Sequence, residues 1–199
     1  MRNNDQENVM EHSWMVAVIA HGLAVIHNRE ALENSQSVAP PTGLETTKSP
    51  ANLAKVDVSA VVIKALYHDV TEVMTGDLPT PVKYHSPKMK DAYGELEDLA
   101  AEQLLHQIPA SYRSAYTSVI QPHDPSVEGL LVKAADKISA WLKCVEERRT
   151  GNQEFQEAEH VIFGELGKIK LPCVDIWMKL YGPAFEMSLD KLGSLGDSQ

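Results

Sequence analysis

The feature that most constrains the fold is a helical spacing of apolar residues, interrupted by short segments of glycine, proline and small polar residues. In the segment from residue 9 to about residue 29, for example, Val16, Ile19 and Leu23 fall on one face of a helix. No stretch shows the period of two that a half-buried strand requires. The pattern therefore predicts an all-α protein.

Further helices are predicted by the same criteria. The second runs from about Val56 to Met74, capped near Asp57, and ends where Gly76 and Pro79 cannot continue it. The others are expected over about residues 86–106, 110–119, 126–149, 153–166 and 173–191.

One domain over residues 1–192 accommodates these helices, because 199 residues is an ordinary size for a single globular domain. Residues 31–52 are rich in serine, threonine and proline without an apolar period, so we expect an exposed insertion loop there. Residues 193–199 are expected to form a polar tail.

Charge and cysteine content narrow the class of partner and the compartment. The chain has 28 acidic and 18 basic side chains and a net charge of −10, whereas nucleic-acid binding requires a basic face. Its two cysteines, Cys144 and Cys173, are too few for a disulfide framework. We see no signal core and no apolar run of the roughly 18 residues that a membrane span requires. These observations predict a cytoplasmic protein without a nucleic-acid or membrane partner.

The candidate chemistry begins with the adjacent residues His68 and Asp69 near the end of the second predicted helix. Imidazole and carboxylate together suit a borderline divalent cation such as Mn, Co or Zn. Glu72 follows within one helical turn, so its carboxylate is expected beside both. A second pair, His123 and Asp124, lies between two prolines on a predicted loop. The first pair is the better candidate, because it follows an apolar helical run in which a buried charge needs a partner.

Two further residues complete the candidate set. His12 shares a helical face with the apolar residues of the first helix, which taken alone fits a buried, hydrogen-bonded imidazole as well as a ligand. Asp136 interrupts a largely apolar segment in the middle of a long predicted helix. Taken alone, this aspartate fits a solvated or lysine-paired carboxylate as well as a ligand.

A histidine, a His-Asp pair and a later aspartate on three separate helices resemble the HD-domain phosphohydrolases. The similarity is closest to the bacterial 5′-deoxynucleotidases of that superfamily and covers about residues 1–190. It rests on residues 11–13, 67–72, 75–84 and 133–136. The stretch Gly-Asp-Leu-Pro-Thr-Pro-Val-Lys-Tyr at residues 76–84 is the most specific of these segments.

This resemblance implies an HD-domain helical bundle that hydrolyses deoxyribonucleoside 5′-monophosphates to deoxynucleoside and phosphate. It implies a divalent cation, Co, Mn or a similar transition metal, a homodimeric assembly, and Glu72 as the catalytic carboxylate. The implied metal ligands are His12, His68, Asp69 and Asp136. The implied substrate-binding residues are His12, Asp69, Asp77, Leu78, Pro79, Thr80 and Asp136.

Members of the resembled family have an additional N-terminal helix with an Arg-Trp pair that contacts the substrate and helps to select deoxyribose. This sequence begins after that pair, so the preference for deoxyribose is the part of the function that the sequence supports least. Two alternatives stay open. The first is an HD phosphohydrolase acting on another phosphorylated nucleotide, and the second is a non-catalytic, metal-binding HD-like regulatory module.

Overall fold

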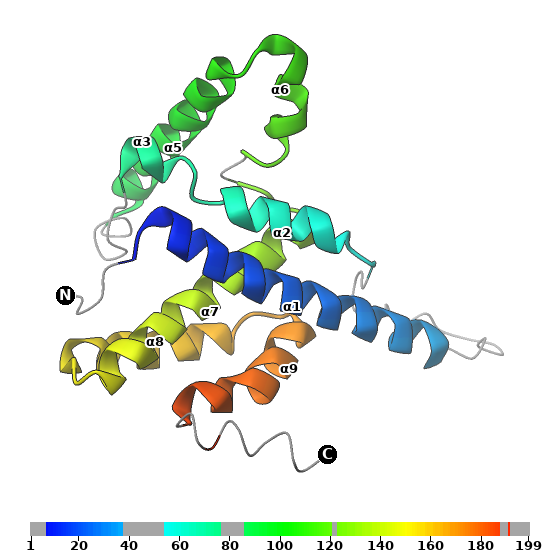
Figure 1. The fold of residues 1–199 in the computed structure, drawn as a ribbon, viewed down its shortest axis with the longest axis vertical. Helices are drawn as coiled ribbons and strands as arrows, with labels where there is room; N and C mark the ends of the chain where they lie inside the picture. Colours follow the sequence, from blue (N-terminus) through cyan, green and yellow to red (C-terminus); the bar gives the residue numbers. More distant parts are fainter. Residues whose placement is uncertain (1–6, 38–53, 77–85, 121–122, 188–190, 192–199) are drawn as a thin grey trace.

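The computed structural model describes residues 7–37, 54–76, 86–120, 123–187 and 191, and all regular elements within these ranges are helices. The long helix α1 (Val9–Ser37) crosses the centre of the molecule (Figure 1). It packs against α2 (Val58–Tyr67), α7 (Val127–Arg149) and α9 (Pro172–Tyr181). The all-α fold class is therefore confirmed.

The remaining elements surround this central group of helices. Helix α8 packs along α7, whereas α5 and α6 extend away from the other helices and α3 packs against α5 (Figure 1). Their bounds are α3 (Glu72–Thr75), α5 (Pro87–Gln107), α6 (Ala110–Thr117), η1 (Gln153–Phe155), α8 (Gln156–Leu166) and η2 (Gly182–Glu186).

The hydrophobic core lies where α1, α2, α7 and α9 meet. The predicted inner face of α1 is buried, with Leu23 fully inaccessible to solvent, and Leu131 and Ile138 of α7 are equally buried. Each such aliphatic side chain stabilises the fold by about 1.5–3 kcal/mol relative to an exposed one. The core thus fixes the relative positions of the three helices that carry the candidate residues.

The prediction that no apolar run reaches the length of a membrane span is wrong. A 25-residue stretch of α1, Val9–Glu33, is long and apolar enough to cross a membrane by length and composition. In this fold one face of the stretch packs against three other helices, and 39% of its most apolar window is buried.

The predicted insertion loop begins later than expected. Helix α1 continues to Ser37, so residues 31–37 are helical rather than looped. Ala31 is buried, and Arg29 Nε lies 2.6 Å from Glu33 Oε1 in an (i, i+4) ion pair that supports the additional turn. Residues 38–53 lie outside the described residues, so the rest of this prediction is untested.

The second predicted helix does not run unbroken to Met74. Helix α2 ends at Tyr67, a turn covers residues 68–71, and α3 begins at Glu72. In the turn, Val70 N bonds to Tyr67 O at 3.1 Å and Glu72 N to Asp69 O at 2.9 Å. These bonds span three residues rather than four, so the chain winds more tightly than an α-helix.

The C-terminal helix is shorter than predicted. Helix α9 ends at Tyr181, where Gly182 and Pro183 enter the 3-10 helix η2, so the predicted continuation to residue 191 is wrong for the residues described up to 187. Proline removes a backbone donor, and glycine has a low helix propensity. The helices predicted to begin near residues 86 and 126 are confirmed, and the Ser86 and Ser126 side chains accept hydrogen bonds from Met89 N and Gly129 N.

Gly129 is required by the close approach of the loop that precedes α7. A Cβ atom at this position would lie 2.3 Å from the backbone oxygen of Asp124 and 2.7 Å from its side chain. We therefore expect Gly129→Ala to lower the free energy of unfolding by about 1–3 kcal/mol, as overpacking does elsewhere. Urea denaturation measures the loss.

Gly164→Ala is the matched control, because this helical glycine has nothing within 4 Å of an added Cβ. Alanine there is expected to be neutral or slightly stabilising. Equal stability of the two variants would contradict the proposed steric conflict at Gly129.

Candidate functional site

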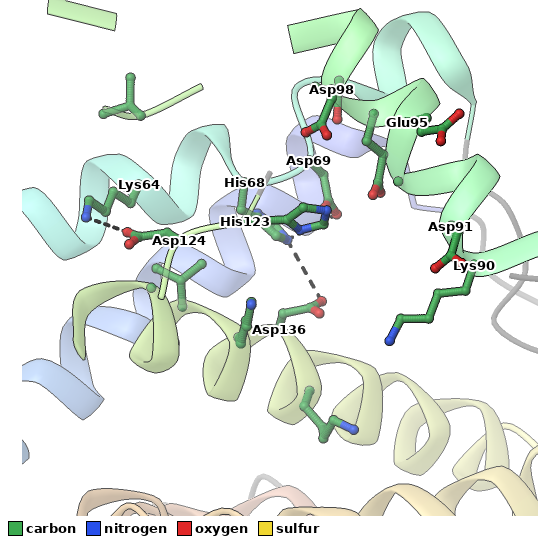
Figure 2. Close-up of a pocket in the computed structure, with 18 residues that line it drawn as sticks. Lys64, His68, Asp69, Lys90, Asp91, Glu95, Asp98, His123, Asp124 and Asp136 are labelled. Carbon is green, nitrogen blue, oxygen red and sulfur yellow. Dashed lines mark hydrogen bonds and ion pairs between the residues drawn. The ribbon is translucent and has the colours of Figure 1, made fainter. Parts of the chain in front are cut away.

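Four side chains from three helical segments converge beside the core. They are His12 from the first turns of α1, His68 and Asp69 from the turn after α2, and Asp136 from the middle of α7. His12 Nε2 lies 3.2 Å from Asp136 Oδ1 and 3.4 Å from Asp69 Oδ2. His68 Nε2 lies 3.0 Å from the same Asp69 oxygen and 3.9 Å from the same Asp136 oxygen. Figure 2 shows His68, Asp69 and Asp136 facing a common space.

The other ring nitrogen of each histidine is held by a different partner. His68 Nδ1 lies 2.8 Å from the backbone oxygen of Ala65, and His12 Nδ1 lies 3.3 Å from Glu7 Oε1. Such contacts orient a histidine so that its Nε2 atom faces a metal. Glu7 was not identified from the sequence, where it is only an acidic residue two positions before the helix that carries His12.

The donor set fits a divalent cation. Ligand atoms of His12, His68 and Asp136 lie within 4.8 Å of one another. His68 Nε2 is buried and makes no hydrogen bond with any described group, although Asp69 lies close to it. A buried imidazole nitrogen aimed at two carboxylates is poorly satisfied by the protein alone, and a cation shared by the four side chains would satisfy it.

The charges of the cluster shift the pKa values of its members in the metal-free protein. Burial alone would lower the pKa of His12 and His68, but the close, negatively charged carboxylates of Asp136 and Asp69, with Glu7 for His12, raise the two pKa values to about 10 and about 9. Burial would raise the pKa of Asp136, but its two histidine partners hold it well below its usual range. The cluster thus stores two exchangeable protons at neutral pH.

Metal binding is expected to release these protons. A histidine with a raised pKa keeps its proton until the pH approaches that pKa, whereas a metal requires the neutral imidazole. The apparent metal affinity should therefore increase steadily from pH 6.5 to 8.5. Calorimetric titration in buffers of different ionisation enthalpy measures the proton release directly. An affinity independent of pH over this range would contradict the predicted protonation state.

A cavity of about 840 Å³ opens onto the cluster. It is bounded by His68 and Asp69 on one side, by Asp136 on α7, and by Asp91 and other side chains of α5 (Figure 2). Cavities of this size accommodate small organic ligands. The Asp136 side chain is 47% exposed because it faces this cavity, so a ligand in the cavity would meet the cluster directly.

Other predicted site residues are placed differently. Glu72 is the first residue of α3 and is partly buried, and it is not among the described residues that line the cavity. Its predicted catalytic role therefore stays a prediction. Asp77, Leu78, Pro79 and Thr80 lie outside the described residues, so the structure does not test their predicted substrate contacts.

The helical fold matches that of a known structure. The chain is similar to the crystal structure of an HD-domain phosphohydrolase from Listeria innocua, with a TM-score of 0.71 and 23% sequence identity. The match covers 92% of this chain and 79% of that chain. The fold is therefore that of the HD-domain phosphohydrolases.

The sequence comparisons identify the family. Residues 1–40 and 43–185 match the model of the YfbR-like 5′-deoxynucleotidases. Two 5′-deoxynucleotidases, from Yersinia pseudotuberculosis and Yersinia pestis, are each 36% identical over 193 residues, covering 96% of this chain and 87% of theirs. The chain belongs to the YfbR-like 5′-deoxynucleotidase family.

Proposed function

We propose that this protein hydrolyses deoxyribonucleoside 5′-monophosphates to a deoxynucleoside and inorganic phosphate. The observation that carries the proposal is the convergence of two imidazole Nε2 atoms with two carboxylates at the end of a nucleotide-sized cavity. Membership of the 5′-deoxynucleotidase family supplies the reaction and the substrate class. The reaction is chemically demanding, since phosphate monoesters hydrolyse extremely slowly in water.

His12, His68, Asp69 and Asp136 would hold the cation. A divalent metal bound there would neutralise phosphoryl oxygens and lower the pKa of a bound water. The mixture of nitrogen and oxygen ligands favours Co, Mn or a similar transition metal over Mg or Ca, which prefer oxygen ligands. Asp69 and Asp136, which face the cavity, would also fix the position of the substrate phosphate through the cation that they hold.

Glu72 is proposed as the carboxylate that orients the attacking water and accepts its proton. Its backbone nitrogen bonds to Asp69 O at 2.9 Å, so the turn that places Asp69 in the cluster also fixes the start of α3. A carboxylate close to the cation but outside its ligand set remains able to accept a proton. Asp77, Leu78, Pro79 and Thr80 are proposed to line the nucleoside part of the pocket, as in the family motif.

A substrate panel tests the proposal. Purified protein is stripped of metal and assayed for phosphate release from dAMP, dGMP and dTMP, the matching ribonucleotides, and other phosphorylated nucleotides, with and without Co or Mn. We expect release from the deoxynucleoside monophosphates that requires added metal. Cleavage confined to other nucleotides would favour the broader phosphohydrolase alternative. Metal binding without any cleavage would favour the regulatory-module alternative.

The assembly is proposed to be a homodimer in the cytoplasm. An apolar stripe on the outer face of α1 supports self-association: Met10, Trp14 and Val18 are 74%, 63% and 52% exposed and follow one another at (i, i+4) spacing. Cys144 and Cys173 are free and buried, as suits a reducing compartment. Light scattering should give twice the chain mass, and Trp14→Glu should shift the protein toward the monomer.

A further inference from the structure

The second His-Asp pair of the sequence, His123 and Asp124, lies at the same cavity as the metal-binding cluster. Both residues line the cavity together with His68, Asp69 and Asp136. In Figure 2 the ring of His123 projects into the cavity in front of His68, on the side where Asp69 lies. The Nε2 atom of His123 also comes close to α5, 3.6 Å from where a Cβ of Gly94 would stand.

The loop that carries His123 is held by Asp124. Lys64 Nζ on α2 lies 2.6 Å from Asp124 Oδ2, and Asp124 Oδ1 accepts a hydrogen bond from Ser126 N at 2.9 Å. Both charged side chains are mostly buried, with exposures of 21% for Lys64 and 15% for Asp124. The backbone of Asp124 also rests against Gly129, where no side chain would fit. His123 is therefore attached to a fixed point of the backbone.

This attachment distinguishes His123 from the lysines that line the cavity. Lys90 and Lys133 also line it, and like His123 they occupy exposed positions, but their side chains have more rotatable bonds than that of a histidine. A flexible lysine loses substantial rotamer entropy when it is fixed against a ligand, whereas a histidine on a fixed backbone loses less. An imidazole N–H at the cluster end of an acidic cavity is a suitable donor to an anionic ester.

We propose that His123 donates a hydrogen bond to the phosphate ester of the bound substrate, and that Asp124, held by Lys64, is the positioning residue that keeps it there. This inference rests on the proposed function for the identity of the ester. It adds a contact from the loop before α7, which carries none of the four metal-binding side chains.

The test compares His123→Ala with His160→Ala, an exposed histidine on α8 away from this cavity. A hydrogen bond to a charged group contributes about 1.5–3 kcal/mol, so kcat/KM for dAMP should fall roughly 10–100-fold in the first variant. His160→Ala should match the wild type. His123→Gln, which keeps an N–H donor, should recover part of the loss. Wild-type kcat/KM in His123→Ala would overturn the proposal.

Product binding to the metal-loaded protein shows which part of the substrate His123 contacts. Measured by calorimetry, the affinity for inorganic phosphate should fall about 10-fold or more in His123→Ala, and the affinity for deoxyadenosine should be unchanged. A lower affinity for deoxyadenosine alone would overturn the proposal that His123 contacts the phosphate ester. The phosphate measurement needs no turnover. A wild-type protein that binds phosphate through His123 but cleaves no nucleotide would therefore contradict the proposed function without contradicting this contact.

The positioning role has its own test in a double-mutant cycle. Lys64→Met should lower kcat/KM in the wild-type background and have little further effect in the His123→Ala background, because the histidine it positions is already gone. Lys64→Arg, which keeps the ion pair, should restore most of the activity. Circular dichroism and thermal melting confirm that each variant is folded. Full additivity of Lys64→Met and His123→Ala would overturn the positioning role.

Discussion

Glu72→Ala is expected to reduce the rate of phosphate release by roughly 10²–10⁴-fold, the range that a general base or acid contributes. Metal affinity should stay close to that of the wild type, because Glu72 is not one of the four proposed ligands. The variant should also keep its fold, since Glu72 is partly exposed at the first residue of the short helix α3. Single-turnover phosphate release and a metal titration of the same sample measure the two quantities together.

Two comparisons make this result specific. Glu72→Gln keeps the size and polarity of the side chain but removes its basicity, so it should be as inactive as the alanine variant. Glu157→Ala, at an exposed glutamate on α8, should have wild-type activity. Retention of full activity in Glu72→Ala would remove Glu72 from the mechanism and leave water activation to the cluster alone.

Asp136→Asn should abolish metal binding under assay conditions and, with it, the activity. Asp136 Oδ1 is approached by both imidazoles, at 3.2 Å from His12 and 3.9 Å from His68. Changes in the groups behind metal ligands reduce metal affinity about 10–100-fold, so loss of a ligand charge should exceed 100-fold. Metal content after dialysis and calorimetric affinity provide the measurement.

Asp175→Asn is the matched control, because Asp175 is an exposed aspartate in the first turn of α9. Its metal content and activity should equal those of the wild type. The same substitution at Asp136 also removes one of the two carboxylates that both imidazoles share, so the pKa values of His12 and His68 should fall. Wild-type metal content in Asp136→Asn would show that the other three side chains suffice to hold the cation.

Much of the fold follows from local sequence signals. The helix bounds that were predicted wrongly are those that tertiary contacts determine. The starts of α5 and α7 were predictable because Ser86 and Ser126 are N-cap residues before apolar helical runs. The extension of α1 beyond residue 30 was not, because it depends on the burial of Ala31 against other elements. The turn after Tyr67 was also missed, since no glycine or proline marks it.

In the candidate site, too, some residues could be predicted from the sequence and others depend on tertiary contacts. The types and order of His12, His68, Asp69 and Asp136 singled them out in the sequence, and their side chains do come together in the fold. Their role as metal ligands stays a prediction. His123 was passed over because its loop has no helical pattern, and its position at the cavity depends on tertiary contacts such as the ion pair between Lys64 and Asp124.

The distance along the chain between the clustered residues has a consequence for the protein as a whole. His12 and Asp136 are 124 positions apart, and the helices that carry them, α1 and α7, are also the main walls of the core. A cation held between them would act as a reversible crosslink across most of the polypeptide. Because a ligand that binds only the native state stabilises it, a chelator would act on this enzyme as a mild denaturant as well as an inhibitor.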